Sequence, residues 1–233
     1  MLEGIDMRIP AYEERKKELF VFIEALKKKD DSPVADLLSL RTTMRATAVL
    51  LLYNMVEFTV TYCLRYIHDM IKEHKVPYRE MTKAIQNITI TYYVNKIKMT
   101  KGDYDTAAQI RHMLAQVNDV ELSFMTYDEF AAICPLYSGN LDSKVIRSVL
   151  KKYGICSCVR SRELKTVREK RNRLAHGEDT FEEIGRDLSI EYVETLMNST
   201  FEAMETMIEE VGAFIAERSY MSFGHESDEN NAM

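Results

Sequence analysis

The sequence predicts an all-α fold: a helical bundle with a long central helix and a long C-terminal helix. The chain of 233 residues has only 8 glycines and 4 prolines, fewer turn-forming residues than an all-β fold would use. Hydrophobic residues make up 46% of it, enough for a sizeable core, and its 14 methionines suit the irregular gaps between packed helices. Since no internal repeat or linker interrupts the chain, we predict one domain over residues 1–224.

The first predicted helix covers residues 11–29, with an apolar face opposite a charged one. That apolar face consists of Leu19, Phe20, Ile23 and Leu26. A break at Asp30-Asp31-Ser32-Pro33 follows, where the serine is placed to cap a new helix and the proline to occupy its first position.

The central helix is predicted from about residue 34 to residue 73. It is apolar nearly all round, which is typical of a helix buried within a bundle. One stripe along it repeats at intervals of three or four residues and comprises Leu50, Tyr53, Asn54, Glu57, Val60, Thr61 and Leu64.

Capping residues, glycines and prolines divide the rest of the chain into six further predicted helices. They cover residues 81–98, 104–117, 127–133, 142–153, 160–176 and 189–219. The first of these contains the strand-like run 88–94, but its helical surroundings favour a helix. Thr126 is placed to cap the helix 127–133, and Gly154 and Gly177 to end two others. Residues 225–233 have no apolar segment to bury, so we expect a disordered tail.

Cysteine usage and the lack of targeting signals indicate a cytoplasmic protein. The four cysteines are too scattered for a disulfide framework, and Cys156-Ser-Cys158 lacks the spacing of a common zinc site. The N-terminus has no basic segment followed by an apolar run. The longest apolar stretch, 46–56, is well short of the roughly 20 residues of a membrane span. We therefore expect reduced thiols, no metal, no cofactor and no membrane association.

Charge is distributed very unevenly along the chain, whose net charge is −6. Between Lys144 and Arg173, eleven lysines and arginines stand against two acids. From Glu178 to the C-terminus, fifteen acids stand against two arginines. This asymmetry suits a confined site for a polyanion on an otherwise repulsive surface. The alternative is that basic and acidic helices lie side by side and pair.

The segment 171–176, Arg-Asn-Arg-Leu-Ala-His, is the candidate site for chemistry. Asn172 and His176 are four residues apart and so share a helix face, which Arg168 continues. Arg171 is five residues before His176, which is roughly 140° around a helix. A second copy of the helix, brought up by a two-fold axis, would place two Arg, two Asn and two His in one cleft.

These residue types suit metal-free cleavage of RNA. Histidine can take and give a proton near neutral pH, and arginine matches the oxygens of a phosphate. An asparagine can hydrogen-bond the imidazole or a phosphate oxygen. The 2′-hydroxyl of RNA supplies the nucleophile. By spacing alone, the same hexapeptide also fits a helix end with a surface histidine.

The pattern Arg-Asn-x-x-x-His at a helix end is similar to the signature of the HEPN superfamily, which includes many prokaryotic ribonucleases of toxin and antiviral systems. Several further segments resemble the MAE-type HEPN family, and the resemblance spans roughly residues 10–220, strongest at 138–189. These segments are 138–147, 152–155, 164–177, 181–189 and, upstream, 51–57.

The resemblance implies a HEPN-type bundle that dimerises through its motif helices and cleaves RNA without a metal. Arg171 and His176 match the catalytic pair, and Asn172 matches the polar position. Tyr53, Asn54 and Glu57 match positions that we interpret as supporting. Glu57 is equally compatible with a structural role, as a buried carboxylate paired with a basic residue of the motif helix. Some HEPN families carry a tyrosine two places after the histidine, but here Glu178 stands there.

The predicted partners are RNA and a second copy of the chain, with an antitoxin or defence-system protein as a further candidate. We predict Lys165, Arg168 and Arg173 as substrate-binding residues within the basic run. The main alternative is a non-catalytic module that binds RNA or a protein through the same surface. A DNA-directed nuclease of a restriction system would require metal ligands that the sequence does not suggest. The remaining histidines, His68, His74 and His112, are interpreted as surface or satisfied side chains.

Overall fold

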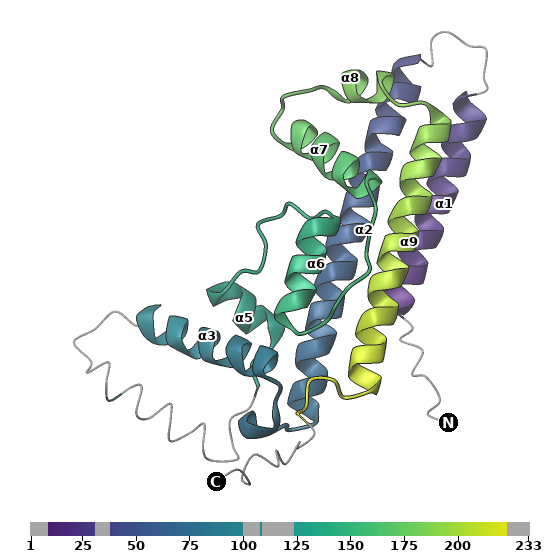
Figure 1. Cartoon of the computed structure of the whole chain (residues 1–233). Coiled ribbons are helices and arrows are strands. Elements are labelled where there is room, and N and C mark those ends of the chain that lie inside the picture. The colour runs from purple at the N-terminus through teal and green to yellow at the C-terminus, as the bar shows by residue number, and fades with distance from the viewer. Residues whose placement is uncertain (1–8, 31–37, 100–107, 109–123, 223–233) are drawn as a thin grey trace, which may run out of the picture.

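A computed structural model describes residues 9–30, 38–99, 108 and 124–222 of the chain. Within these ranges the regular elements are helical, apart from an isolated bridge between Met81 and Met221. The longest helices, α1 (Pro10–Asp30), α2 (Leu38–Glu73) and α9 (Ile190–Ala216), lie side by side as a bundle (Figure 1). The predicted all-α fold with long central and C-terminal helices is confirmed.

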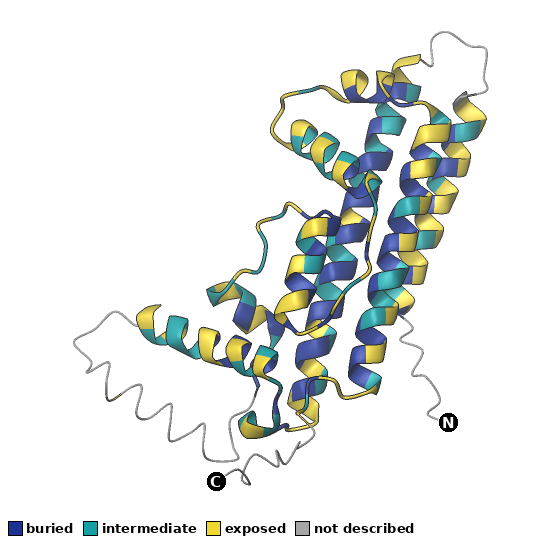
Figure 2. Ribbon diagram, viewed as in Figure 1, coloured by how far each residue is buried: buried dark blue, intermediate teal, exposed yellow. Residues whose placement is uncertain are grey.

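Shorter elements surround one side of this bundle. They are η2 (Tyr78–Glu80), α3 (Lys83–Met99), α5 (Tyr127–Ile133), α6 (Ser143–Lys152), α7 (Glu163–Ala175) and α8 (Phe181–Arg186). α5, α7 and α8 pack directly on α2, and α3 packs on α5 and α6. α7 therefore projects from the middle of the molecule, with much of its surface exposed (Figure 2).

α2 is the central helix of the fold, as predicted. Its 36 residues contact α1 and α9 on one side and the shorter helices on the other. By length and composition α2 passes as a candidate membrane span, with a mean hydropathy of 1.4 over its most apolar window. However, 56% of that window is buried inside the protein, which is the situation of a core helix (Figure 2).

The predicted apolar face of the first helix is correct except at one position. Leu19, Ile23 and Leu26 are buried, but Phe20 is 42% exposed. The Phe20 ring lies at the edge of the α1–α9 contact, with its centroid 5.3 Å from that of Phe201. The Phe20 side chain is thus at the rim of the core, because on α1 it lies next to the row of buried side chains and not within that row.

The ambiguous segment 81–98 forms helix α3. Its buried side chains, Ile85, Ile88, Thr89 and Tyr92, recur at helical spacing, so packing decides against the strand-like composition.

The helix predicted over 160–176 begins later, at Glu163, because residues before it bind back to α6. Ser143 donates its hydroxyl to the carbonyl of Ser161 (2.7 Å) and accepts the Ser161 amide (2.9 Å). The predicted helix 104–117, apart from residue 108, and the predicted tail 225–233 lie outside the described residues.

Helix α8 was not predicted, although the sequence carries a signal for it. Thr180 and Glu183 form a capping box, in which each side chain accepts the backbone amide of the other residue. Thr126 and Glu129 form the same box at α5, where a helix was predicted. α8 packs tightly on α2, since a Cβ added to Gly185 would lie 1.8 Å from the carbonyl oxygen of Thr42.

His68 joins α6 to the central helix from within the core. Its Nδ1 lies 2.9 Å from the carbonyl oxygen of Met125, and its Nε2 lies 2.9 Å from the Tyr153 hydroxyl. A carbonyl only accepts, so Nδ1 carries the proton and Nε2 accepts from Tyr153. Burial lowers the pKa of His68 to about 4, so the ring is neutral near pH 7. His68 is therefore a histidine with its hydrogen bonds satisfied, as predicted. His74 is another, because its Nδ1 is hydrogen-bonded to the hydroxyl of Tyr220. His112 lies outside the described residues.

We predict that Gly185→Ala lowers the free energy of unfolding by about 1–3 kcal/mol or more, because the added methyl group overlaps the α2 backbone. Urea unfolding followed by circular dichroism measures the change. Gly177→Ala is the matched control: a Cβ there meets nothing within 4 Å, and only its φ of +68° opposes alanine, which costs about 1 kcal/mol. Equal losses in the two variants would contradict the close approach of α8 to α2.

Candidate functional site

Helix α7 ends in a glycine cap that leaves His176 at the surface. The Gly177 amide donates to the Leu174 carbonyl (3.2 Å) and the Glu178 amide to the Arg173 carbonyl (2.9 Å). Gly177 adopts a φ of +68°, which glycine tolerates without strain. The imidazole of His176 is exposed and makes no hydrogen bond or ion pair with any side chain in the described ranges.

Arg171 points the other way, toward α2. Its guanidinium carbon lies 4.4 Å from the centre of the Tyr53 ring, a cation–π arrangement. Its Nη2 lies 3.7 Å from Oε1 of Glu57. With its side chain 28% exposed, Arg171 is held by α2 yet remains reachable from solvent. Glu57 thus pairs with a basic residue of the motif helix, as its structural interpretation expected, although its carboxylate is only partly buried at 33% exposure. Such a pair is equally compatible with a supporting role at a catalytic site.

Tyr53 supports this arrangement from inside the protein. Its hydroxyl donates to the Gly139 carbonyl and accepts the Leu141 amide at 3.1 Å. Burial raises the pKa of Tyr53, so the hydroxyl keeps its proton. The Tyr53 hydroxyl thus fixes the loop 139–141, and the Tyr53 ring lies against the guanidinium of Arg171.

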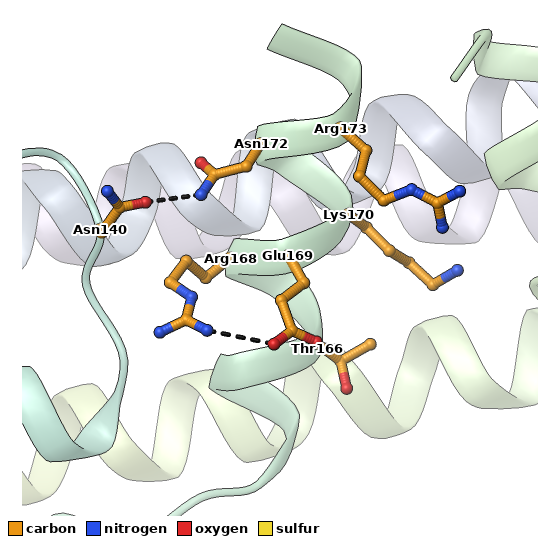
Figure 3. Close-up of a pocket in the computed structure, with 7 residues that line it drawn as sticks. All are labelled: Asn140, Thr166, Arg168, Glu169, Lys170, Asn172 and Arg173. Carbon is orange, nitrogen blue, oxygen red and sulfur yellow. Dashed lines mark hydrogen bonds and ion pairs between the residues drawn. The ribbon is translucent and has the colours of Figure 1, made fainter. Parts of the chain in front are cut away.

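Asn172 links the arginine to the same loop. Its Oδ1 accepts from Nη1 of Arg171 at 3.1 Å, and its Nδ2 donates to Oδ1 of Asn140 at 2.5 Å (Figure 3). The amide is therefore oriented by Arg171 and Asn140, and it does not bond the imidazole of His176. Asn140 was given no role from the sequence, although it belongs to the segment 138–147 that carries the family resemblance.

Three predicted substrate-binding residues are engaged with acids of their own neighbourhood. Arg168 pairs with Asp142, which caps α6, and lies 3.1 Å from Glu169. The other pairs are Arg173 with Asp179 (2.7 Å) and Lys165 with Glu169 (3.7 Å).

Two acids of α9 form ion pairs with lysines of α1: Glu194 with Lys27 and Glu205 with Lys16. α9 also packs on α2 and α7, but the described residues of α7 and α9 form no ion pair with each other. The alternative expected from the sequence, pairing between basic and acidic helices, therefore takes a different form, because the charges of α7 are partly neutralised by acids close to them.

A groove of about 530 Å³ runs along the outer face of α7. Its lining is mostly polar or charged and comes from α7 and one residue of the loop before α6 (Figure 3). The lining residues are Asn140, Thr166, Arg168, Glu169, Lys170, Asn172 and Arg173. Sequence reasoning gave no individual role to Asn140, Thr166, Glu169 or Lys170. Of these, Asn140 becomes a neighbour of the motif only through tertiary folding.

The structure brings together only part of the predicted site. Tyr53, Glu57, Arg171 and Asn172 form one connected cluster. Asn54 is exposed on α2 and, like His176, has no hydrogen bond to a described side chain. In the described parts of the chain, no three His, Cys, Asp or Glu side chains gather as a metal site.

Comparison with known proteins identifies the class of this helical domain. The family model described as HEPN_MAE_28990/-like HEPN matches residues 10–220. Since the match covers most of the chain, the protein belongs to this HEPN family, and its bundle is the all-α HEPN fold. No curated protein and no solved structure matches the chain. HEPN domains are commonly ribonucleases.

We predict that Tyr53→Phe lowers the free energy of unfolding by about 1–3 kcal/mol, because the buried Leu141 amide loses its acceptor. Urea unfolding gives the value. Tyr192→Phe is the control, because Tyr192 is 37% exposed on α9. A loss at position 53 no larger than at position 192 would argue against the hydroxyl as an anchor of the loop.

Proposed function

We propose that this protein is a cytoplasmic, metal-independent endoribonuclease that acts as a homodimer. The observation that carries the proposal is the arrangement of α7. A guanidinium held by α2 and an exposed imidazole, which has no side-chain partner among the described residues, lie within one helix end. Membership of a HEPN family adds a class of domain in which ribonuclease activity is common.

Arg171 suits the binding of a scissile phosphate. Tyr53, Glu57 and Asn172 fix its position in advance, so little conformational entropy is lost when a phosphate binds. The Glu57 carboxylate at 3.7 Å is too far for a strong hydrogen bond. The guanidinium therefore keeps donors for the oxygens of the pentacoordinate phosphate.

His176 suits the proton transfers. As general base it takes the proton of the 2′-hydroxyl, whose oxygen attacks the neighbouring phosphorus. As the bond from phosphorus to the 5′-oxygen breaks, a protonated imidazole gives its proton to that oxygen. The products are a 2′,3′-cyclic phosphate and a 5′-hydroxyl. An imidazole that has taken a proton as base can give it up again as acid, so one His176 suffices for each site.

The need for a second subunit follows from the directions of the two side chains. Arg171 turns toward α2, whereas His176 stands at the exposed end of α7. A two-fold axis near the end of α7 brings the imidazole of each subunit to the guanidinium of the other. Asn172 orients Arg171, and Tyr53, Asn54 and Glu57 support the site.

Lys165, Arg168 and Arg173 are proposed to exchange their present acid partners for RNA phosphates. Exposed ion pairs such as Lys165–Glu169 are weak, so a polyanion competes with them effectively. The Arg168–Asp142 pair is largely buried, with side-chain exposures of 21% and 13%, so exchange of its partner costs more. In the cell, an antitoxin or a defence-system protein that covers the exposed end of α7 would restrain such an enzyme.

We predict that Arg171→Ala and His176→Ala each reduce cleavage of single-stranded RNA by about a hundredfold or more. Arg186→Ala, which removes an exposed arginine of α8, is the control and keeps full activity. Circular dichroism verifies folding, and end analysis of the products looks for the cyclic phosphate. RNA binding without cleavage by the wild-type protein would select the non-catalytic module, and loss of cleavage in EDTA would exclude the metal-free mechanism.

The dimer is tested by complementation. Mixed dimers of Arg171→Ala and His176→Ala subunits regain part of the activity if one site uses both chains, because one intact arginine then meets one intact histidine. Light scattering establishes the oligomeric state of each preparation. A wild-type monomer that cleaves RNA, or mixed dimers as inactive as their parents, would contradict the shared site.

A further inference from the structure

A second cavity lies away from the motif, where α3, α5 and α6 meet. Its volume is about 580 Å³. Its apolar lining includes Ile88 of α3 and Phe130 of α5, followed by Pro135 and Leu136. Two amide side chains, Asn87 and Asn95, and two lysines, Lys151 and Lys152, complete it. None of these groups has a part in the site on α7.

The lysines of this cavity form no ion pair with a described acid. Lys151 and Lys152 are exposed in the last turn of α6, and no ion pair within the described ranges includes either. Lys144, at the other end of α6, is likewise exposed and unpaired within the described ranges. On α7, most basic side chains pair with acids, and among its described residues Lys170 is the exception. Positive charge that is available without breaking a pair is therefore present along α6 as well as at Lys170 of the α7 groove.

α6 connects the two places directly. Its N-terminal cap, Asp142, is bound to Arg168 of α7, and its last turn carries the two cavity lysines. The helix has 10 residues, so the cavity lies about 15 Å from that ion pair at 1.5 Å per residue. Lys144 and Lys151 are seven residues apart and so lie on one face of α6, and Lys152 adjoins Lys151. The exposed lysines of α6 thus stand at both ends of the helix, one near the Asp142–Arg168 ion pair and two at the cavity.

The lining of the cavity suits a nucleotide better than a bare anion. An apolar wall accepts the faces of a base, and side-chain amides both donate to and accept from its edge. Nδ2 of Asn95 already donates to Sγ of Cys134 at 3.2 Å, which leaves the amide oxygen directed elsewhere. The ammonium groups of Lys151 and Lys152 at the rim match the phosphates on either side of that base.

We propose that this cavity is an accessory RNA-binding site, which holds one nucleotide of a single strand whose neighbouring segment reaches α7. The proposal rests on the proposed function, because it takes the substrate to be RNA. The site lengthens the contact between enzyme and strand along α6 and gives the enzyme a means of choosing among RNAs at a position that is not cut.

The test measures binding of single-stranded RNA by fluorescence anisotropy in a His176→Ala background, so that no cleavage interferes. Replacing Lys151 and Lys152 together by alanine weakens binding by about tenfold at low salt and reduces the slope of log K against log salt by about 1.4. The matched control is the double replacement of Lys28 and Lys29, two exposed lysines at the far end of α1, which leaves the slope unchanged. Equal slopes in the two double variants would overturn the proposal.

A second variant separates the base from the phosphates. Thr91→Phe fills the cavity from an exposed position of α3 and is expected to weaken RNA binding with the salt slope intact. Ile90→Phe, at the neighbouring exposed residue outside the cavity, is its control and binds normally. If Thr91→Phe bound RNA with unchanged affinity, the cavity would not be a binding pocket for a base.

A free mononucleotide distinguishes the source of the ligand. Suppose that adenylate or uridylate binds the cavity and that neither variant changes the affinity for RNA. The cavity would then be a small-molecule site, and the proposed RNA site would be overturned. The outcomes also separate the two proposals. Cleavage with no effect of the cavity variants would sink the accessory site alone, whereas binding that depends on the cavity without any cleavage would sink the nuclease alone.

Discussion

The stacking of the Arg171 guanidinium on the Tyr53 ring is the contact on which the organisation of the site depends. Tyr53 is buried in α2 and binds the backbone of the loop 139–141 with its hydroxyl. Asn172 then joins Arg171 to Asn140 of the same loop. Three segments distant in sequence are thus fixed to one aromatic ring, so the position of the arginine is set by the core of the bundle rather than by the surface helix that carries it.

The charges around this contact show why a strongly basic segment need not be a strongly basic surface. Arg168, Arg173 and Lys165 are each engaged with nearby carboxylates, which lowers the local field of α7. The groove there combines donors with the acid Glu169. Lys144, Lys151 and Lys152 of α6, which form no ion pair within the described ranges, carry positive charge outside the motif helix.

The sequence was sufficient for the fold class and for most helices, because helical periodicity and capping residues are local signals. Thr126 caps a helix where it was expected to, while α8 was missed although Thr180 and Glu183 form a capping box. The Arg171–Asn172–His176 segment was found at a helix end, as predicted. The residues that contact this segment could not be predicted from the sequence. Asn140 and Asp142 approach α7 only through tertiary folding, and no spacing rule relates them to it. The exposure of Phe20 depends likewise on how α1 and α9 meet.

The fully buried side chains of α7, Leu164 and Val167, both lie in its first half. Its second half, which leads to His176, is held by polar and cation–π contacts and by the partly buried Leu174. The end of the helix that bears the imidazole therefore contributes no fully buried side chain to the core. An opposing surface can cover this end without displacing any of the fully buried side chains of the bundle.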